Sequence, residues 1–158
     1  MQTCSIAIAD EQALGPLAAA LAAALPERAC VALHGDLGAG KTTFVKAVAA
    51  AAGIDPAEVV SPTFGLVHVH AVPGRRLVHA DMYRLAAAAD LHEIGWEETV
   101  AAAGWVFVEW PERIAAALPA DRLDVQIRIE SPSARTFTFH ATGPAHEAVV
   151  DRLAPPAR

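Results

Sequence analysis

The amino-acid sequence predicts an α/β fold with a mixed, mostly parallel sheet flanked by helices, and three observations carry this prediction. An apolar run over 29–34, a glycine-rich stretch over 35–42 and an Ala-rich segment follow one another in the order strand, loop, helix. The run 106–108 is apolar throughout, as in a strand buried on both faces. Residues 123–129 alternate apolar with polar and precede a Ser-Pro-Ser turn and a second run over 136–141, which predicts an antiparallel C-terminal hairpin at an edge of the sheet.

The first half of the chain supplies the remaining N-terminal elements. Residues 4–9 alternate weakly and are typical of an edge strand. Asp10 is a suitable N-cap for an amphipathic helix over 11–25, although Pro16 either kinks this helix or marks the start of its regular part. Apolar residues at helical spacing predict the next helix over 42–52, and Gly53 ends it.

The second half begins with two short strands, 66–71 and 76–80, joined by a Pro-Gly turn. Short helical segments are then expected over 90–94 and 96–103, with a strand from Trp105 between the second of them and a further short helix over 111–118. The C-terminal hairpin precedes a last helix, 145–153. One domain over 1–153 is therefore expected, with a frayed tail over 154–158.

The segment 35–42, called the glycine loop from here on, matches the pattern G-x-x-x-x-G-K-[ST] of a phosphate-binding loop. Its glycines allow positive φ and close approach to an oxygen, so that backbone N–H groups and the positive end of the next helix face a polyphosphate. Lys41 adds a charge for the β- and γ-phosphates, and the Thr42 hydroxyl suits Mg²⁺. The loop predicts a P-loop NTPase whose cofactor-binding residues are Gly35, Asp36, Leu37, Gly38, Ala39, Gly40, Lys41, Thr42 and Thr43.

Magnesium at such a loop also needs an acid at the end of a neighbouring strand. Glu109 ends the most hydrophobic strand, which is therefore expected to be central and adjacent to the loop strand. Asp81 ends the hairpin strand, in the position that an acid takes in the chain order of a small GTPase. We predict that Glu109 and Thr42 bind the metal and that Asp81 is a switch residue linked to metal or water, with the direct ligand left open between the two acids.

Thr63 follows a rigid Pro62 and is a candidate sensor of the γ-phosphate, the alternative being an ordinary turn before a strand. With Lys41, Glu109 and Asp81 it completes the predicted catalytic set. Arg84 and Arg113 are the candidates for an arginine finger.

Two further features have alternative interpretations. If the Pro-Gly turn is two residues long, His68 pairs opposite His79 and shares a face with His70, so that three imidazoles could hold zinc; ordinary polar strand positions are the alternative. Trp110 precedes Pro111, which predicts an extended backbone. Its ring could contact the site, a partner or the core.

The 158-residue composition restricts the partners. The net charge is -6, the pI is about 5.6 and no run of Lys or Arg occurs, which disfavours direct binding to nucleic acid or an anionic membrane. Lys41 and Lys46 are the only lysines, so the Lys-containing signature of guanine selection cannot occur and adenine is indicated. Cys4 and Cys30 are expected to be free thiols. With no signal peptide or membrane span in the sequence, a cytoplasmic location is expected.

Four segments together resemble the TsaE family, the small bacterial ATPases of tRNA threonylcarbamoyladenosine biosynthesis. They are the glycine loop with Thr43 and Phe44, Ser61-Pro62-Thr63-Phe64, His79-Ala80-Asp81-Met82-Tyr83-Arg84-Leu85 and Val108-Glu109-Trp110-Pro111-Glu112. The resemblance implies ATP and Mg²⁺ as cofactors, weak hydrolysis alone, and docking on a TsaB–TsaD protein complex that modifies the adenosine beside the tRNA anticodon. Contact with tRNA would be indirect, and no membrane is involved.

The chain departs from this family at two places. The segment 11–15 lacks the Thr that members often have near the nucleotide base, and Met82 replaces a usual Leu. Two other functions are compatible with the glycine loop: a small-molecule kinase, which would need an Arg-rich lid, and a nucleotide-gated binding module without useful hydrolysis.

Overall fold

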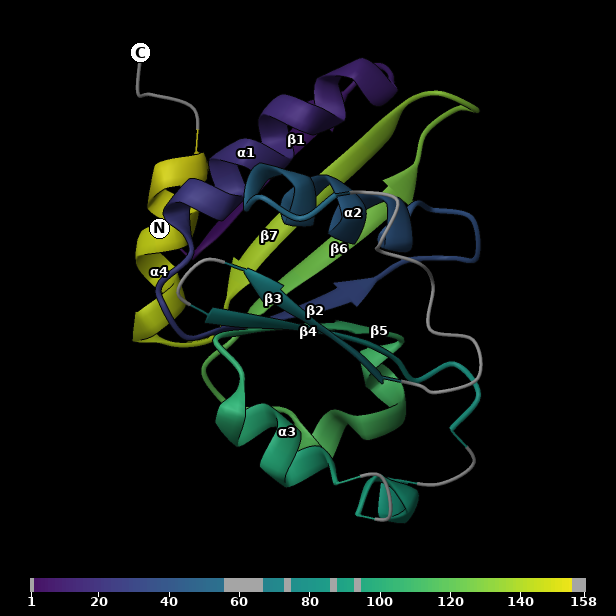
Figure 1. Ribbon diagram of the computed structural model, residues 1–158. Helices are drawn as coiled ribbons and strands as arrows, with labels where there is room; N and C mark the ends of the chain where they lie inside the picture. The colour runs from purple at the N-terminus through teal and green to yellow at the C-terminus, as the bar shows by residue number, and fades with distance from the viewer. Residues whose placement is uncertain (1, 56–66, 73–74, 86–87, 93–94, 155–158) are drawn as a thin grey trace.

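The computed structural model describes residues 2–55, 67–72, 75–85, 88–92 and 95–154 (Figure 1). Its strands are β1 (Thr3–Ile8), β2 (Ala29–His34), β3 (Val67–Val72), β4 (Arg75–Asp81), β5 (Trp105–Glu109), β6 (Leu123–Ile129) and β7 (Arg135–Ala141). Its α-helices are α1 (Leu14–Ala24), α2 (Lys41–Ala51), α3 (Trp96–Ala102) and α4 (Pro144–Leu153). Segments of 3₁₀ helix are η1 (Glu11–Ala13), η3 (Ala88–Leu91) and η4 (Pro111–Ala117).

The described strands form one mixed sheet in the order β1-β7-β6-β2-β5-β4-β3. Its centre is parallel, because β2 pairs in parallel with both β5 and β6, and β4 pairs in parallel with β5. The outer pairs β3–β4, β6–β7 and β1–β7 are antiparallel. The predicted α/β class, the parallel core and the antiparallel C-terminal hairpin are therefore confirmed.

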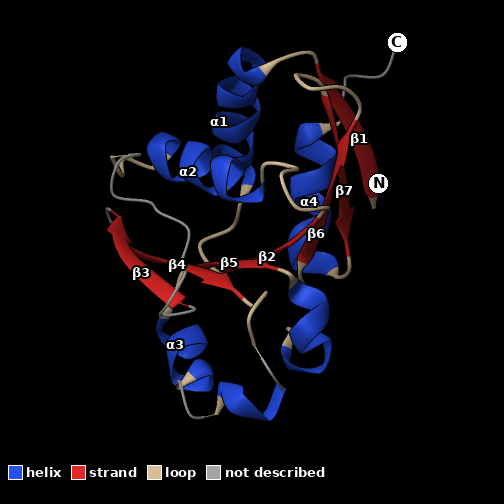
Figure 2. Ribbon diagram, turned by 90° about the vertical axis from the view of Figure 1, so that its right-hand side faces the viewer, coloured by secondary structure: helices blue, strands red, loops and turns tan. Residues whose placement is uncertain are grey.

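Helices cover both faces of this sheet, and each face has its own hydrophobic core. Figure 2 shows α1, α2 and α4 on one side of the strands and α3 on the other. The larger core joins the helices of the first side to the sheet, through residues such as Leu21, Phe44 and Val150. The smaller core lies on the other side and includes Trp96 and Ile114. The sheet is thus held rigidly between two apolar layers.

The parallel strands β2, β5 and β4 end at the same edge of the sheet. Leu33 pairs with Glu109, and Glu109 pairs with Asp81, so the ends of the three strands are in register. The glycine loop follows β2 directly. In open α/β sheets the crevice beyond the carboxyl ends of the strands is where ligands bind. The prediction that the strand of Glu109 lies next to the loop strand is correct.

The first predicted helix divides into two parts. Asp10 Oδ1 accepts a hydrogen bond from the N–H of Ala13 at 3.2 Å and caps the short η1 segment, after which α1 begins at Leu14. Pro16 lies in the first turn of α1, where a backbone N–H has no partner within the helix anyway. Pro16 therefore does not kink the helix.

The two cysteines are free and buried, as predicted. Burial raises the pKa of the Cys30 thiol to about 12, so this group is an inert apolar side chain at neutral pH. Among the described residues, no helix has the length and apolar character needed to cross a membrane. The predicted domain limits, 1–153, stay a prediction, and residues 155–158 lie outside the described part of the chain.

Candidate nucleotide and metal site

The glycine loop is shaped by glycines at both of its ends. Gly40 has φ 105° and ψ 26°, a left-handed conformation that only glycine adopts readily, and α2 begins at the next residue. Gly35 lies so close to β6 that a Cβ atom at this position would be 2.8 Å from the carbonyl oxygen of Ile127. The first N–H groups of α2 have no acceptor within the helix, so they are available to an anion at the loop.

Arg135, at the start of β7, ties the loop to the rest of the sheet. Its Nε donates to the carbonyl oxygen of Ala39 at 3.0 Å, and its Nη1 donates to the carbonyl oxygens of Ser131 and Ala134 at 2.8 and 3.0 Å. One guanidinium therefore joins the loop to the β6–β7 turn. Sequence reasoning missed this residue, since a single Arg at the start of a strand has no distinguishing pattern.

Lys41, the first residue of α2, points back into the loop. Its side chain is buried, and Nζ donates to the carbonyl oxygens of Gly35 and Asp36 at 2.5 and 3.2 Å. Burial lowers the pKa of Lys41, whereas the nearby negative charges, that of Glu109 foremost, act in the opposite direction. An anion placed among the loop N–H groups would therefore be met by a positive charge that is poorly solvated.

Thr42 and Glu109 meet across the end of the sheet. The Thr42 hydroxyl lies 3.0 Å from Oε1 and 2.8 Å from Oε2 of Glu109, whose side chain is buried. Mg²⁺ binds oxygens at about 2.0–2.1 Å in an octahedron, which places adjacent ligands roughly 2.8–3.0 Å apart. The two side chains thus have both the chemistry and the spacing that this metal requires.

Asp81 lies beside this pair, at the end of β4. Its Oδ1 accepts a hydrogen bond from the N–H of Tyr83 at 2.9 Å. Burial raises the pKa of Asp81, the Tyr83 hydrogen bond lowers it, and the negative charge of Glu109 raises it further. Two carboxylates so close together are stabilised by a cation, because each disfavours the charge of the other.

Two neighbouring cavities open on the glycine loop. The smaller, about 300 Å³, is lined by the loop and by Asp81, Tyr83, Glu109 and Trp110. The larger, about 420 Å³, lies between the loop, the start of α1 and the β6–β7 turn. Gly38, Gly40 and Thr43 line both, so a ligand at the loop could extend from one cavity into the other.

Trp110 departs from the prediction. Its backbone is left-handed, with φ 56° and ψ 50°, instead of extended. Tertiary contacts explain the difference: the ring lies 4.1 Å from Nζ of Lys41 and 5.0 Å from the ring of Tyr83, centroid to centroid. The contact with Lys41 is a cation–π interaction, which repays the cost of a positive φ. Of the three positions predicted for this ring, two are observed, because the ring contacts the site and also packs, partly buried, against the smaller core.

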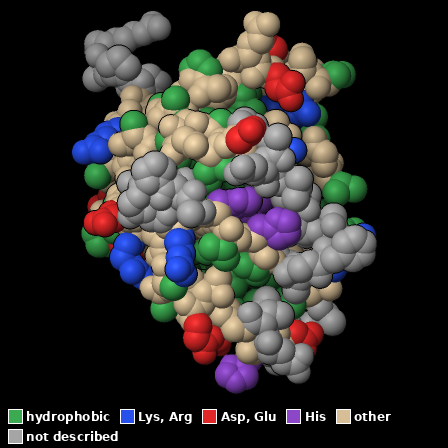
Figure 3. Space-filling model, in the orientation of Figure 1, with side chains coloured by type: hydrophobic (Ala, Val, Ile, Leu, Met, Phe, Trp, Pro, Cys, Tyr) green, Lys and Arg blue, Asp and Glu red, His purple; other side chains and the backbone are tan. Residues whose placement is uncertain are grey.

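The predicted pairing of the histidines is observed, but a zinc site is not found among the described residues. His68 pairs opposite His79, as predicted, and the rings of His68 and His70 lie 6.3 Å apart. Figure 3 shows histidine side chains near the centre of the face it presents. Among the described residues, however, no three His, Cys, Asp or Glu side chains are arranged to hold a metal ion, so the zinc alternative has no support.

His79 has another partner, which the sequence reasoning did not find. Its Nε2 lies 2.5 Å from Oε2 of Glu109, and its ring is fully buried. His79 and Asp81 are two residues apart on β4 and so share a face of the sheet, and this spacing was the signal available in the sequence.

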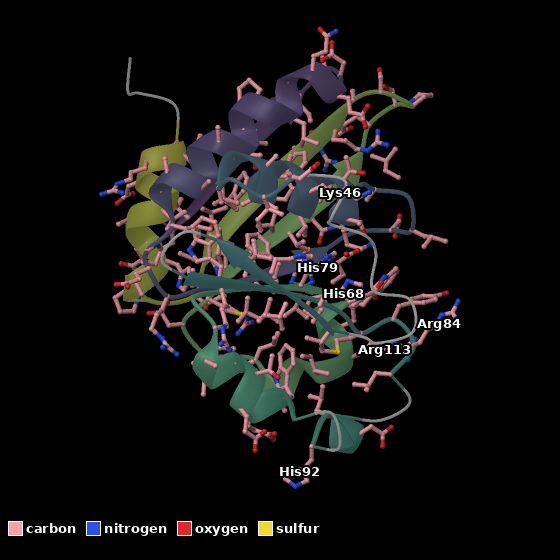
Figure 4. The ribbon with its side chains drawn as sticks, in the orientation of Figure 1. Lys46, His68, His79, Arg84, His92 and Arg113 are labelled. Carbon is pink, nitrogen blue, oxygen red and sulfur yellow. The ribbon has the colours of Figure 1, made fainter. Side chains whose placement is uncertain are left out.

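Both candidates for an arginine finger, Arg84 and Arg113, have exposed side chains, and Arg84 lies at the periphery of the view in Figure 4. Thr63 lies outside the described residues.

The fold and this site define the class of the protein: an α/β protein with a glycine loop between the central strand of a mixed sheet and a helix. A family model described as "Threonylcarbamoyl adenosine biosynthesis protein TsaE" matches residues 8–137. The chain belongs to the TsaE family of tRNA threonylcarbamoyladenosine biosynthesis proteins.

Individual relatives agree with this assignment. The chain is 42% identical over 115 residues to the tRNA threonylcarbamoyladenosine biosynthesis protein TsaE of Treponema pallidum, covering 72% of this chain and 83% of that protein. It is 36% identical over 121 residues to the Bacillus subtilis protein of the same name, covering 77% and 75%. The crystal structure of B. subtilis YdiB matches with a TM-score of 0.78 at 28% identity, covering 96% of this chain and 94% of that one.

Proposed function

We propose that this protein is an ATPase that binds ATP with Mg²⁺ at the glycine loop and, docked on a TsaB–TsaD complex, hydrolyses ATP to support threonylcarbamoylation of the adenosine next to the tRNA anticodon. The observation that carries the proposal is the meeting of the Thr42 hydroxyl with the Glu109 carboxylate beside the Lys41 ammonium. A hydroxyl and an acid suit the metal, and the ammonium suits the phosphates that the metal accompanies.

The two cavities support a placement for the nucleotide. The phosphates would occupy the smaller cavity, within reach of Lys41 and the N–H groups at the start of α2. The base and sugar would extend past Thr43 into the larger cavity, which Glu11 and Leu14 line in place of the Thr that the family often has in this segment. The backbone of Gly35, Asp36, Leu37, Gly38, Ala39 and Gly40 would surround the phosphate chain.

Each predicted catalytic residue has a role in this proposal. Lys41 would exchange the carbonyl oxygens of Gly35 and Asp36 for phosphate oxygens, which its poorly solvated charge favours. Thr42 and Glu109 would hold Mg²⁺, which when bound neutralises charge on the phosphates. Asp81 would respond to the presence of the metal through its proximity to Glu109. Thr63 would sense the γ-phosphate, as proposed from the sequence.

The charge distribution supports indirect contact with tRNA. The net charge is -6, and the Lys and Arg side chains visible in Figure 3 are dispersed over that face. Binding to nucleic acid draws most of its affinity from clustered positive charge. The tRNA would therefore be held by the TsaB–TsaD partners.

The test compares the two lysines of the chain. Both lie on α2, so Lys46→Ala is a matched control for Lys41→Ala. With TsaB, TsaD and tRNA present, we expect Lys41→Ala to lower ATP hydrolysis and tRNA modification by about 10²–10³-fold, the usual effect of losing one preorganised charge contact. Lys46→Ala should retain both activities.

Equal modification by Lys41→Ala and the unchanged protein would refute the proposal. Labelled phosphate transferred to a metabolite instead of released as free phosphate would identify a kinase. ATP-dependent binding to the partners with background phosphate release would identify a nucleotide-gated module.

A further inference from the structure

His79 lies directly behind the candidate metal site. Its ring is fully buried on β4, beside β5, and Nε2 lies 2.5 Å from Oε2 of Glu109. In Figure 4 its label falls among the central strands, whereas Arg84 and His92 lie at the periphery. A buried histidine at this distance from a carboxylate holds that carboxylate in place.

The environment of the ring indicates which nitrogen carries the proton. Nδ1 is buried and has no hydrogen-bond partner among the described residues. A proton on Nδ1 alone would be a buried donor without an acceptor, and it would leave the Nε2 lone pair facing the carboxylate oxygen of Glu109. A proton on Nε2 instead donates to Oε2 of Glu109, so the contact requires this proton.

This donor leaves the two oxygens of Glu109 unequal. Oε2 lies 2.5 Å from Nε2 of His79 and 2.8 Å from the Thr42 hydroxyl, whereas Oε1 lies 3.0 Å from the same hydroxyl, whose single proton is nearer to Oε2. Oε1 is thus the oxygen with spare lone-pair capacity within the described structure. A carboxylate anchored through one oxygen cannot rotate freely, so the other oxygen keeps a fixed direction.

We propose that His79 is a positioning residue that orients Glu109 for Mg²⁺ through the Nε2–H···Oε2 hydrogen bond. This inference rests on the proposed function, because it concerns the same metal. Second partners that orient a metal ligand typically change metal affinity by about 10–100-fold when they are removed. His79 does not touch the phosphates in this proposal, so ATP binding without metal should not depend on it.

Three variants test the proposal in the full-length chain. His79→Leu removes the donor, and His79→Gln replaces it with an amide N–H. His146→Leu is the matched control, because His146 is also a buried histidine paired with a carboxylate, that of Asp121. The readouts are the affinity for ATP in EDTA and the affinity of the ATP complex for Mn²⁺, followed by electron paramagnetic resonance.

We expect His79→Leu to bind ATP in EDTA within about twofold of the unchanged protein and to bind Mn²⁺ about 10–100-fold more weakly. His79→Gln should recover most of the Mn²⁺ affinity, and His146→Leu should keep it. Unchanged Mn²⁺ affinity in His79→Leu, or equal losses in the Leu and Gln variants, would overturn the inference. Failure of the unchanged protein to bind ATP at all would instead overturn the proposed function.

A second measurement needs no variant and so does not depend on folding of His79→Leu. Nitrogen-15 NMR of the unchanged protein should show a proton on Nε2 of His79 that is shifted strongly downfield by the hydrogen bond to Glu109. The absence of a proton on Nε2, or its rapid exchange, would contradict the proposed role.

Discussion

The hydroxyl of Thr42 lies within hydrogen-bond distance of both carboxylate oxygens of Glu109, at 3.0 and 2.8 Å, although 67 residues separate the two in the chain. β2 and β5 create this contact by running side by side in parallel, with Leu33 opposite Glu109. The register of the sheet thus brings the two side chains together. The proposed metal-binding role of each can be tested by substituting one at a time.

Thr42→Ala should lower Mg²⁺-dependent ATP hydrolysis by about 10²–10³-fold, because one of the two oxygen ligands is lost. Thr42→Ser keeps the hydroxyl and should remain within a few-fold. The measurement is phosphate release against Mg²⁺ concentration in the presence of TsaB and TsaD. Equal activity of the Ala and Ser variants would show that the hydroxyl does not serve the metal.

Trp110 should report ATP binding by its fluorescence, since phosphates would draw the Lys41 ammonium away from a ring now 4.1 Å away. The two other tryptophans, Trp96 and Trp105, are only 4% and 2% exposed and should contribute little to the change. We expect the signal to disappear in both Trp110→Phe and Lys41→Ala. An undiminished response in Trp110→Phe would place its origin elsewhere.

Arg135→Met should destabilise the protein by about 1.5–3 kcal/mol, because hydrogen bonds from a charged group to the loop and the β6–β7 turn are lost. Arg128→Met on the same hairpin is the control, since the Arg128 side chain is 70% exposed and pairs only with the exposed Glu130 among the described residues. Its effect should stay within about 0.5 kcal/mol. Urea unfolding measures the stability of both variants. Similar midpoints would show that the hydrogen bonds of Arg135 to the loop and the turn do not stabilise the protein.

Gly35→Ala should cost about 1–3 kcal/mol, because its Cβ would lie 2.8 Å from the backbone oxygen of Ile127, which cannot move without shifting β6. Gly15→Ala is the control: it lies in α1 with open space beyond its chain neighbours, and its gain in helix propensity is opposed by the contact of its Cβ with the ring of Pro16, so its effect should stay within about 0.5 kcal/mol. Thermal unfolding should therefore show a lower midpoint for Gly35→Ala than for Gly15→Ala. Equal midpoints for the two variants would show that crowding at Gly35 is unimportant.

Asp121 should make stability depend on pH. Burial acts to raise its pKa, but the hydrogen bonds from the His146 ring and the N–H of Ala145 outweigh this and hold the pKa below its usual value of 3.8. A carboxyl with a lowered folded-state pKa stabilises the protein above the unfolded-state value, and this stabilisation is lost as the pH falls through the folded-state pKa.

The measurement is urea unfolding of the unchanged protein and of Asp121→Asn between about pH 2 and pH 7, a range that brackets the titration of an aspartate side chain. The difference in stability between the two should be largest at the upper end and should narrow as the pH falls below 3.8. A difference that does not vary with pH would exclude the charge of Asp121 as its cause.

Local patterns were sufficient for much of the fold. The strand over 29–34 was predicted with the limits that β2 has, because an apolar run bounded by polar residues and glycine is unambiguous. The neighbouring position of β5 followed from its continuous hydrophobicity. The presence of Thr42 and Glu109 in one site could accordingly be predicted from the sequence.

Contacts between segments far apart in the chain could not be predicted from the sequence. The C-terminal hairpin was expected at an edge of the sheet, whereas β6 pairs with the central β2 and β1 lies beyond β7. The pre-proline rule failed at Trp110, because contacts with Lys41 and Tyr83 outweigh a local steric preference. Arg135 and the role of His79 were missed for the same reason, since each depends on a partner in another strand or loop.

The close approach of Gly35 to Ile127 and the tie from Arg135, which lies 96 residues beyond Ala39, have a consequence for biosynthesis. A nascent chain exposes the whole phosphate-binding motif while β6 and β7 are still untranslated. Until those strands emerge from the ribosome and dock, the motif lacks the neighbours that shape it. If the protein binds ATP as proposed, the nucleotide would therefore be captured only after β6 and β7 have docked, and ATP would favour chains in which these strands are in place.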